Sequence, residues 1–238
     1  MRAKPLPQRV AGLDWTRIAA DLDRDGYATT GPLLTDSECA ALAGLYEDTA
    51  RFRNKVIMAR HGFGRGEYQY FGYPLPDSVQ ALREALYPQL AAVANSWGHA
   101  LKRKDKYPGD LSSYLAHCHR AGQGRPTPLL LKYEAGDYNC LHRDLYGDLV
   151  FPLQATVLLS TPREGFTGGE FVLTEQRPRM QSRAAVVPLE RGEAVLFAVN
   201  ERPVQGKRGI YRVTMRHGVS ALHSGRRFTL GIIFHDAR

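Results

Sequence analysis

The fold and the chemistry of this protein are predicted from one stretch of its sequence, Tyr133-Glu-Ala-Gly-Asp-Tyr-Asn-Cys-Leu-His-Arg-Asp144. It ends in the triplet His142-Arg-Asp144, and side chains two residues apart on a β-strand point to the same side. An imidazole and a carboxylate can therefore both reach one metal ion. A second histidine from a distant strand would complete a facial triad, which leaves positions open on iron for a cosubstrate and oxygen.

A His-x-Asp triplet is short enough to arise by chance, so the blocks on either side of it matter. Upstream, Tyr133 and Gly136 extend the motif to Y-x-x-G-x-x-x-x-x-H-x-D. Downstream, His217 lies in Arg-His-Gly-Val-Ser, and Arg227 follows ten residues later in Gly-Arg-Arg-Phe-Thr. Between them, Thr-Gly-Gly-Glu-Phe at 167–171 is typical of a turn that leads into a strand.

The order and spacing of these blocks resemble the iron(II)/2-oxoglutarate dioxygenase superfamily. With Tyr70-Phe71, Phe151-Pro-Leu-Gln154 and the block around His217, the chain looks like a bacterial oxygenase group described as acting on damaged DNA and related to the AlkB-type alkylation-repair enzymes. The resemblance covers residues 129–235 and extends more loosely to the N-terminal half.

The resemblance implies a role for each matched residue. His142, Asp144 and His217 would bind Fe(II), with 2-oxoglutarate and O2 as cosubstrates. Arg227 would pair with the distal carboxylate of 2-oxoglutarate, a bidentate contact that arginine makes better than lysine. Two further residues would assist at the cosubstrate: Thr229, which shares the strand face of Arg227, and Tyr133 on an adjacent strand.

Other histidines compete for these roles. We favour His217 over His223, because His223 precedes a turn glycine and is expected to be exposed. His117 and His119 cannot share a metal ion if they lie on a helix, where residues two apart point about 200° from each other. Arg226 is expected to face away from Arg227, toward solvent, whereas Phe228, Leu230, Ile232 and Phe234 would form the apolar face of that strand.

The periodicity predicts two kinds of structure in one domain, residues 1–238. Up to about residue 122 the pattern is helical, with helices after Asp14, after the capping pair Thr35 and Glu38, over 77–104 and over 111–120. From 123 to 238 the period changes to two, with strands expected at Leu129–Tyr133, Phe151–Ser160, Glu170–Thr174, Glu193–Val199, Ile210–Met215 and Arg226–Phe234. We therefore expect an α+β fold: a double-stranded β-helix (a cupin-like jelly roll) with N-terminal helices packed on it.

Residues 51–73 form the strongest basic and aromatic cluster, with five Arg or Lys, six aromatic residues and four glycines. Aromatic and basic groups that alternate on a flexible segment suit stacked bases and phosphates. Candidate contacts to nucleic acid are Arg51, Arg53, Lys55, Tyr70 and Phe71. The alternative is a Gly-rich surface loop that folds its aromatic rings onto the barrel and leaves its arginines solvated.

Composition narrows the classes of protein further. The 238 residues carry 32 Lys and Arg against 24 Asp and Glu, a net charge of +8 that is compatible with a polyanionic partner. No apolar run approaches the roughly 18 residues of a membrane span, and no apolar block follows the basic N-terminus as in a signal peptide. The three cysteines do not suggest a disulfide framework, so we expect a cytoplasmic protein, and a monomer.

Three functions stay open at this point. The first is an oxygenase that demethylates alkylated DNA or another nucleic acid. The second is a hydroxylase of a protein side chain or a small molecule. AlkB-type enzymes have Asn where this chain has Leu131, and an R-x-N-x-x-x-R end that Arg227–Ile233 lacks; the ten-residue step from His217 to Arg227 is closer to prolyl-hydroxylase-like members. The third is an inactive jelly-roll binding module, against which the complete triad argues.

Overall fold

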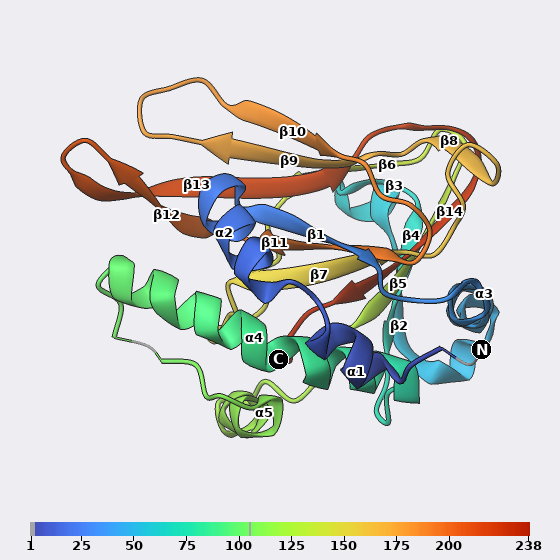
Figure 1. Ribbon diagram of the computed structural model, residues 1–238. Coiled ribbons are helices and arrows are strands. Elements are labelled where there is room, and N and C mark those ends of the chain that lie inside the picture. The colour runs from blue at the N-terminus through green and yellow to red at the C-terminus, as the bar shows by residue number, and fades with distance from the viewer. Residues whose placement is uncertain (1–2, 105) are drawn as a thin grey trace.

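The computed structural model describes residues 3–104 and 106–238. Over these residues antiparallel strands build two facing sheets, and helices cover the outer face of the larger sheet (Figure 1). The strands are β1 (Tyr27–Pro32), β2 (Phe52–Ile57), β3 (Gly64–Arg65), β4 (Glu67–Phe71), β5 (Leu129–Glu134), β6 (Tyr138–His142), β7 (Leu153–Leu158), β8 (Phe166–Gly168), β9 (Phe171–Gln176), β10 (Arg183–Val187), β11 (Glu193–Ala198), β12 (Glu201–Gly206), β13 (Gly209–Val219) and β14 (Leu222–Ile232).

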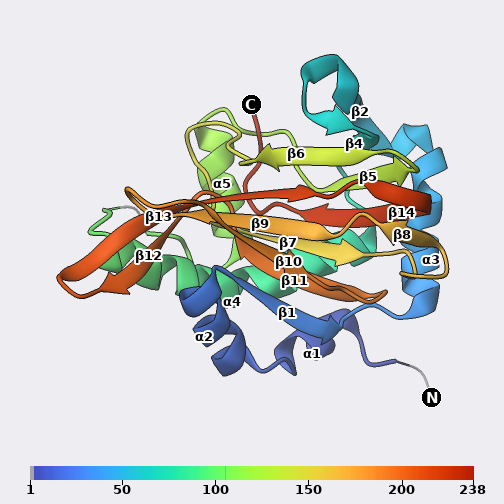
Figure 2. The ribbon, with the colours of Figure 1, turned by 90° about the horizontal axis from the view of Figure 1, so that it is seen from above.

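The order of the strands shows a jelly roll, as predicted. The larger sheet runs β1-β11-β7-β14-β5-β4-β2, with β8 paired to β14, and the smaller sheet runs β10-β9-β13-β6-β3, with β12 paired to β13. Seen from above, β6, β9 and β13 of the smaller sheet lie over β14, β7 and β11 of the larger one (Figure 2). This arrangement brings β6 and β13, which carry the two predicted metal-binding histidines, side by side.

The helices are placed largely where the sequence predicts them. They are α1 (Leu6–Ala11), α2 (Trp15–Asp25), α3 (Asp36–Gly44), α4 (Asp77–Ala100) and α5 (Leu111–Arg120), with 3-10 turns η1 (Leu45–Glu47), η2 (Thr49–Arg51) and η3 (Met58–His61). Asp14 caps α2 by accepting a hydrogen bond from the Arg17 amide, and Thr35 and Glu38 form the predicted capping box of α3. Helix α4 contains Pro88 and buries its apolar stripe.

The core has two layers, and β14 belongs to both. On the helix side, Leu230, Ile232 and Phe234 pack into the cluster that includes the apolar stripe of α4, and Phe228 packs against the same cluster. On the opposite face of β14, Arg227 and Thr229 line a cavity between the sheets. The alternation predicted for this strand is confirmed.

The N-terminal half is less helical than its periodicity suggests. Strands β1, β2 and β4 come from this half and extend the larger sheet, β1 at one edge and β2 at the other. Edge strands are partly solvated on both faces, and the burial along β1 and β2 does not alternate, so a period of two leaves little trace in their sequences. The segment 51–73 is therefore an ordered hairpin of the sheet, not the flexible segment expected.

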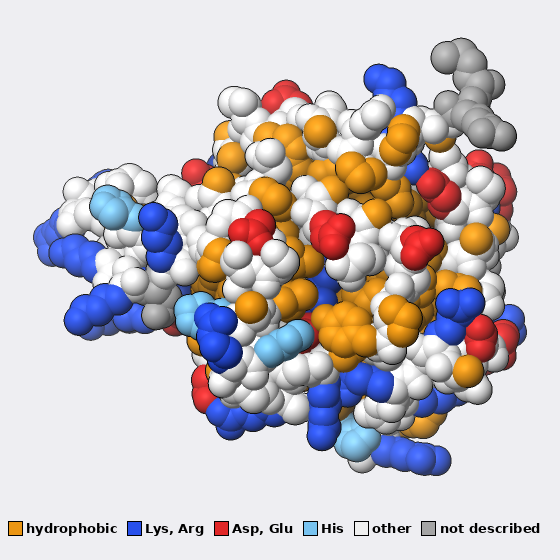
Figure 3. All heavy atoms as spheres, turned by 90° about the horizontal axis from the view of Figure 1, so that it is seen from below, with side chains coloured by type: hydrophobic (Ala, Val, Ile, Leu, Met, Phe, Trp, Pro, Cys, Tyr) orange, Lys and Arg blue, Asp and Glu red, His pale blue; other side chains and the backbone are white. Residues whose placement is uncertain are grey.

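The surface is basic at its periphery. On the face that carries the helices, apolar side chains gather in the middle and lysine and arginine side chains lie mainly toward the edges (Figure 3). Among the described residues, every helix is too short or too polar to cross a membrane.

Candidate metal centre

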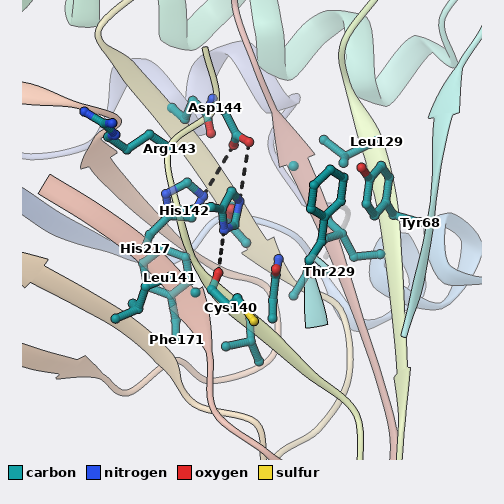
Figure 4. Close-up of a pocket in the computed structure, with 18 of the residues that line it drawn as sticks. Tyr68, Leu129, Cys140, Leu141, His142, Arg143, Asp144, Phe171, His217 and Thr229 are labelled. Carbon is teal, nitrogen blue, oxygen red and sulfur yellow. Dashed lines mark hydrogen bonds and ion pairs between the residues drawn. The ribbon is translucent and has the colours of Figure 1, made fainter. Parts of the chain in front are cut away.

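His142 and His217 face each other across two paired strands. The register of β6 and β13 places His142 directly opposite His217, and the two imidazole rings lie 4.2 Å apart between centroids. Asp144 lies between them: its Oδ1 is 3.4 Å from Nε2 of His142, and its Oδ2 is 3.4 Å from Nε2 of His217 (Figure 4). One ligand atom from each of the three residues lies within 4.8 Å of the other two, which suits one metal ion.

Asp144 reaches this position by a different route from the one the sequence suggested. Strand β6 ends at His142, so Asp144 lies in the segment beyond the strand and not two residues along it. The expectation that the two side chains share a face because both lie on a strand is wrong. In the segment beyond the strand Asp144 is buried, at 8% exposure, and its carboxylate lies beside both histidines.

Hydrogen bonds orient the ligand atoms. Nδ1 of His142 donates to the backbone carbonyl of Cys140 at 2.8 Å, which leaves the lone pair of Nε2 free for a metal. The hydroxyl of Tyr146 donates to Oδ1 of Asp144 at 2.7 Å, which orients the carboxylate and leaves lone pairs on both of its oxygens. Neighbouring groups of this kind fix the orientation of metal ligands.

The electrostatics of the three residues favour a charged carboxylate. Burial acts to raise the pKa of Asp144, but hydrogen bonds from His142 and His217 outweigh it and hold this pKa well below its usual value. Burial, assisted by the charge of His142, lowers the pKa of His217. Burial acts to lower the pKa of His142, but the hydrogen bond to Asp144 and the charge of that carboxylate raise it above its usual value. Metal binding requires neutral imidazoles, so a metal ion would displace a proton from His142.

The competing histidines lie elsewhere. His223 is exposed on β14 and does not line the cavity. His117 is exposed on α5, and His119 is bonded to Asp236 at 2.8 Å. None of these three histidines lies at the His142 site.

Arg227 lies in the same cavity as the three candidate ligands. This cavity has a volume of about 380 Å³, and its walls also include Thr229 and Tyr133. Arg227 is 2% exposed, and within the described part of the chain its Nε and Nη1 atoms are buried without a hydrogen-bond partner. Burial lowers its pKa to about 10. Arg226 points the other way and pairs with Glu134 at 3.2 Å, as expected.

Some of the residues predicted to contact nucleic acid are exposed on the hairpin, and others are buried in it. Arg51 pairs with Asp48 at 2.8 Å and Lys55 with Glu67 at 2.9 Å, both at the surface. The Arg53 guanidinium lies 4.6 Å from the centre of the Tyr70 ring, which is 7% exposed. Phe71 is fully buried and stacks on Phe52 at 4.7 Å. Because its ring fills the core, the expectation that Phe71 stacks on a base is corrected.

Several cavity residues were missed by the sequence analysis. They include Phe63, Tyr68, Asn139, Leu141, Tyr146 and Gln154. Tyr146 could have been proposed, because it follows Asp144 by two residues. Phe63 lies in the segment between η3 and β3, and the others come from strands whose pairing gives no local signal.

The comparisons with known proteins agree with this geometry. Residues 66–237 match the family described as "Oxygenase, catalysing oxidative methylation of damaged DNA". The chain belongs to this oxygenase family. Two uncharacterized proteins of Mycobacterium tuberculosis, Rv2227 of strain H37Rv and MT2286 of strain CDC 1551, are each 48% identical over 167 residues, which cover 70% of this chain and 72% of each relative.

Solved structures show the same fold at low sequence identity. A 2OG-Fe(II) oxygenase-family oxidoreductase from Burkholderia pseudomallei aligns with a TM-score of 0.53 at 14% identity, covering 100% of this chain and 95% of that one. A prolyl-4-hydroxylase from Pseudomonas putida gives 0.52 at 14% identity, with 94% and 99% covered. Together these comparisons show that the protein is an oxygenase by family and has the fold of 2OG-Fe(II) oxygenases, with a His-Asp-His group that suits iron.

Proposed function

We propose that the protein hydroxylates N-alkyl groups on bases of damaged nucleic acid, with His142, Asp144 and His217 as the iron ligands. The observation that carries the reaction type is Arg227, a buried guanidinium with unpartnered nitrogens in the cavity of these ligands, over the described residues. Burying an uncompensated charge is costly, so such a group is best explained by an anion that arrives with the cosubstrate.

The second carboxylate of 2-oxoglutarate is a suitable anion. It would accept hydrogen bonds from Arg227 and from the hydroxyl of Thr229, which is also buried and lies two residues further along β14. Tyr133 is fully buried beside them, with its ring centre 5.6 Å from the Arg227 guanidinium. Its hydroxyl receives a hydrogen bond from Asn139 at 3.4 Å and can donate toward the cosubstrate.

Ferrous iron held by His142, Asp144 and His217 would supply the redox chemistry, in which one oxygen atom of O2 enters a C–H bond and the other is taken up as 2-oxoglutarate becomes succinate and CO2. The protein binds, orients and shields the reactants. Phe171 and Phe197 pack against His217 with ring centroids at 5.9 and 4.6 Å, and so exclude water from one side of the site. On an N-methyl group the product would be a hydroxymethyl amine, which releases formaldehyde and the repaired base.

The substrate class rests on the family and on the charge of the protein. The family description names damaged DNA, and a net charge of +8 favours a polyanion. The cavity is large enough for a small-molecule-sized group, and its walls include Leu129, Leu131 and Tyr68, which suit a planar base. A base reaches such a cavity only from a single strand or after it has been flipped out of a duplex.

The decisive test is succinate release with a panel of substrates. We expect stimulation by single- or double-stranded oligonucleotides that carry N-methylated bases, with stoichiometric formaldehyde, and none by unmethylated controls. Stimulation by peptides or metabolites instead of oligonucleotides would support the protein or small-molecule hydroxylase and contradict this proposal.

The exposed cations at the end of η2 and on β2 provide a separate test. If Arg51 and Lys55 contact phosphates, changing each to Gln should reduce the slope of log K against log salt by roughly 0.7–0.9 per contact. Fluorescence anisotropy with a labelled oligonucleotide at several salt concentrations measures this slope. An unchanged slope would mean that β2 lies outside the bound nucleic acid.

A further inference from the structure

The hairpin between β2 and β4 is joined to the strand that carries His142. Gly64 and Arg65 of β3 pair with Asn139 and Tyr138 of β6, and the Cys140 amide donates to the Phe63 carbonyl at 2.9 Å. The segment thus forms an extra edge strand beside β6 (Figure 1). The backbone of Phe63 is thus bonded to Cys140, two residues before His142.

Glycines make this close attachment feasible. Gly64 has a φ of 125°, and a Cβ there would lie 2.4 Å from the Tyr138 carbonyl oxygen. Gly66 has a φ of 112°, and a Cβ there would lie 3.0 Å from the buried ring of Tyr133. Any other residue at 64 would push the segment off β6, so the position of Phe63 is specified by the sequence.

Phe63 lies at the mouth of the cavity. Its side chain contributes to the cavity wall although it is 47% exposed, and Leu141 beside it is 44% exposed. The His61 ring stacks on Phe63 at 5.3 Å between centroids and 24° between planes. An aromatic ring that is supported on one side and exposed at the entrance of a site is suited to a planar ligand.

Three exposed arginines lie near Phe63 along the chain or on the wall of the same cavity. Arg60 and Arg65 flank Phe63 along the chain, and both are exposed. The nearest carboxylate to Arg65, that of Asp137, is 4.0 Å away. Arg143, also exposed, contributes to the cavity wall, and its guanidinium donates to the neutral amide oxygen of Asn200 at 3.0 Å. These charges are available for phosphates.

We infer that Phe63, supported by His61, is the platform on which an unpaired base of single-stranded nucleic acid stacks at the entrance of the site, with Arg65 and Arg143 at the adjoining phosphates. This inference rests on the proposed function. It adds that the nucleic acid is bound as a single strand and that Phe63 recognises it. Base stacking on aromatic side chains is tolerant of sequence, so the damaged base would be read inside the cavity and its neighbour on Phe63.

The test compares Phe63→Leu, which removes the ring but keeps its apolar character, with Phe63→Tyr, which keeps the ring. The matched control is Ile210→Ala, because Ile210 is similarly exposed at 48% but lies on the distant β12–β13 hairpin. The probe is a methylated single-stranded oligonucleotide that carries 2-aminopurine, whose fluorescence falls when it stacks. Thermal unfolding and Co²⁺ binding show that each variant is folded with an intact metal site.

For Phe63→Leu we expect binding weakened about 5- to 150-fold at unchanged salt slope, with loss of 2-aminopurine quenching. Phe63→Tyr and Ile210→Ala should bind like the wild type. If the wild type demethylates the oligonucleotide and Phe63→Leu binds it equally well, the platform is wrong and the proposed function stands. If the wild type acts on peptides or metabolites and on no oligonucleotide, the proposed function is wrong, and this inference with it.

Discussion

Arg83 and Arg227 are buried to the same degree, at 0% and 2% exposure, but their guanidinium groups have opposite surroundings. Arg83 on α4 donates to the carbonyls of Ile233 and Phe234, and its Nη2 also pairs with Asp236 at 2.7 Å. Arg227 on β14 has Nε and Nη1 without partners among the residues described. The guanidinium on the helix side of the larger sheet thus has hydrogen-bond partners, whereas the one on the cavity side has nitrogens without them.

The difference separates a structural charge from a binding charge. Arg83 fastens the C-terminal segment to α4, and Asp236 completes the arrangement by accepting further hydrogen bonds from His119 and Tyr73. A folded protein tolerates the unsatisfied Arg227 only if its charge has another use. Because the His-Asp-His group lies in the same cavity, the use that we propose is binding the cosubstrate.

The largest effect is expected when the metal group next to Arg227 is dismantled. His142→Ala, Asp144→Ala and His217→Ala should each abolish 2-oxoglutarate turnover, because an open site with three protein ligands cannot spare one. Thermal unfolding should stay close to that of the wild type, since the Arg83 cluster is untouched. His223→Ala is the control; loss of activity in that variant, with activity retained in His217→Ala, would reverse the assignment of the second histidine.

Replacing each arginine with methionine tests whether its charge stabilises the fold. Arg83→Met leaves the buried carboxylate of Asp236 without its main cation and should lower the free energy of unfolding by about 3–5 kcal/mol. Arg227→Met removes a charge that lacks a partner and should leave the free energy of unfolding unchanged or raise it. Urea titration of both variants measures the difference. Equal destabilisation would show that Arg227 is also a structural residue.

The binding role of Arg227 is measured with the cosubstrate. Arg227→Ala should raise the 2-oxoglutarate concentration needed for half-maximal turnover about ten- to a hundredfold, because a charge-assisted hydrogen bond to a carboxylate contributes roughly 1.5–3 kcal/mol. Arg226→Ala is the matched control, since its side chain lies on the opposite face of β14 and pairs with Glu134. Equal effects of the two changes would contradict the assigned role.

Local patterns were enough to predict the part of the site that lies on regular strands. The alternation along 226–234 correctly separates Arg227 and Thr229 from Phe228 and Leu230, because a side-chain period of two needs no knowledge of neighbouring strands. The structure also brings His142, Asp144 and His217 together as the motif spacing suggested. Their binding of iron stays a prediction that the variants above test.

Features that depend on distant pairing could not be predicted in this way. Phe63 and Phe71 belong to the same aromatic and basic segment, yet Phe71 fills the core and Phe63 lies at the cavity mouth. What separates them is the attachment of β3 to β6, about 75 residues further along the chain. The position of Asp144 likewise depends on the path of the segment that follows β6 and not on a strand period.

A final, smaller effect concerns acid sensitivity on the Arg83 side of the sheet. Nδ1 of His235 accepts a hydrogen bond from the Phe151 amide at 3.3 Å, and Nε2 is buried with no partner among residues 3–104 and 106–238. Burial, and then the charge of Arg83, lowers the pKa of His235 from 6.5 to about 4. The folded protein therefore keeps His235 neutral at pH values where the unfolded chain already binds a proton.

The sign of the effect follows from this difference. Stability that depends on neutral His235 is complete above pH 6.5 and is lost as the pH falls toward about 4, where the folded protein also takes up the proton. One proton corresponds to a slope of at most about 1.4 kcal/mol per pH unit. His235→Asn keeps an acceptor for the Phe151 amide and cannot titrate, so its unfolding free energy, measured by urea titration between pH 7 and pH 4, should fall less steeply than that of the wild type. Parallel curves for the two proteins would show that the acid sensitivity arises elsewhere, for example at the Arg9–Glu38 pair, where the hydrogen bond from Arg9 lowers the pKa of Glu38 to about 2.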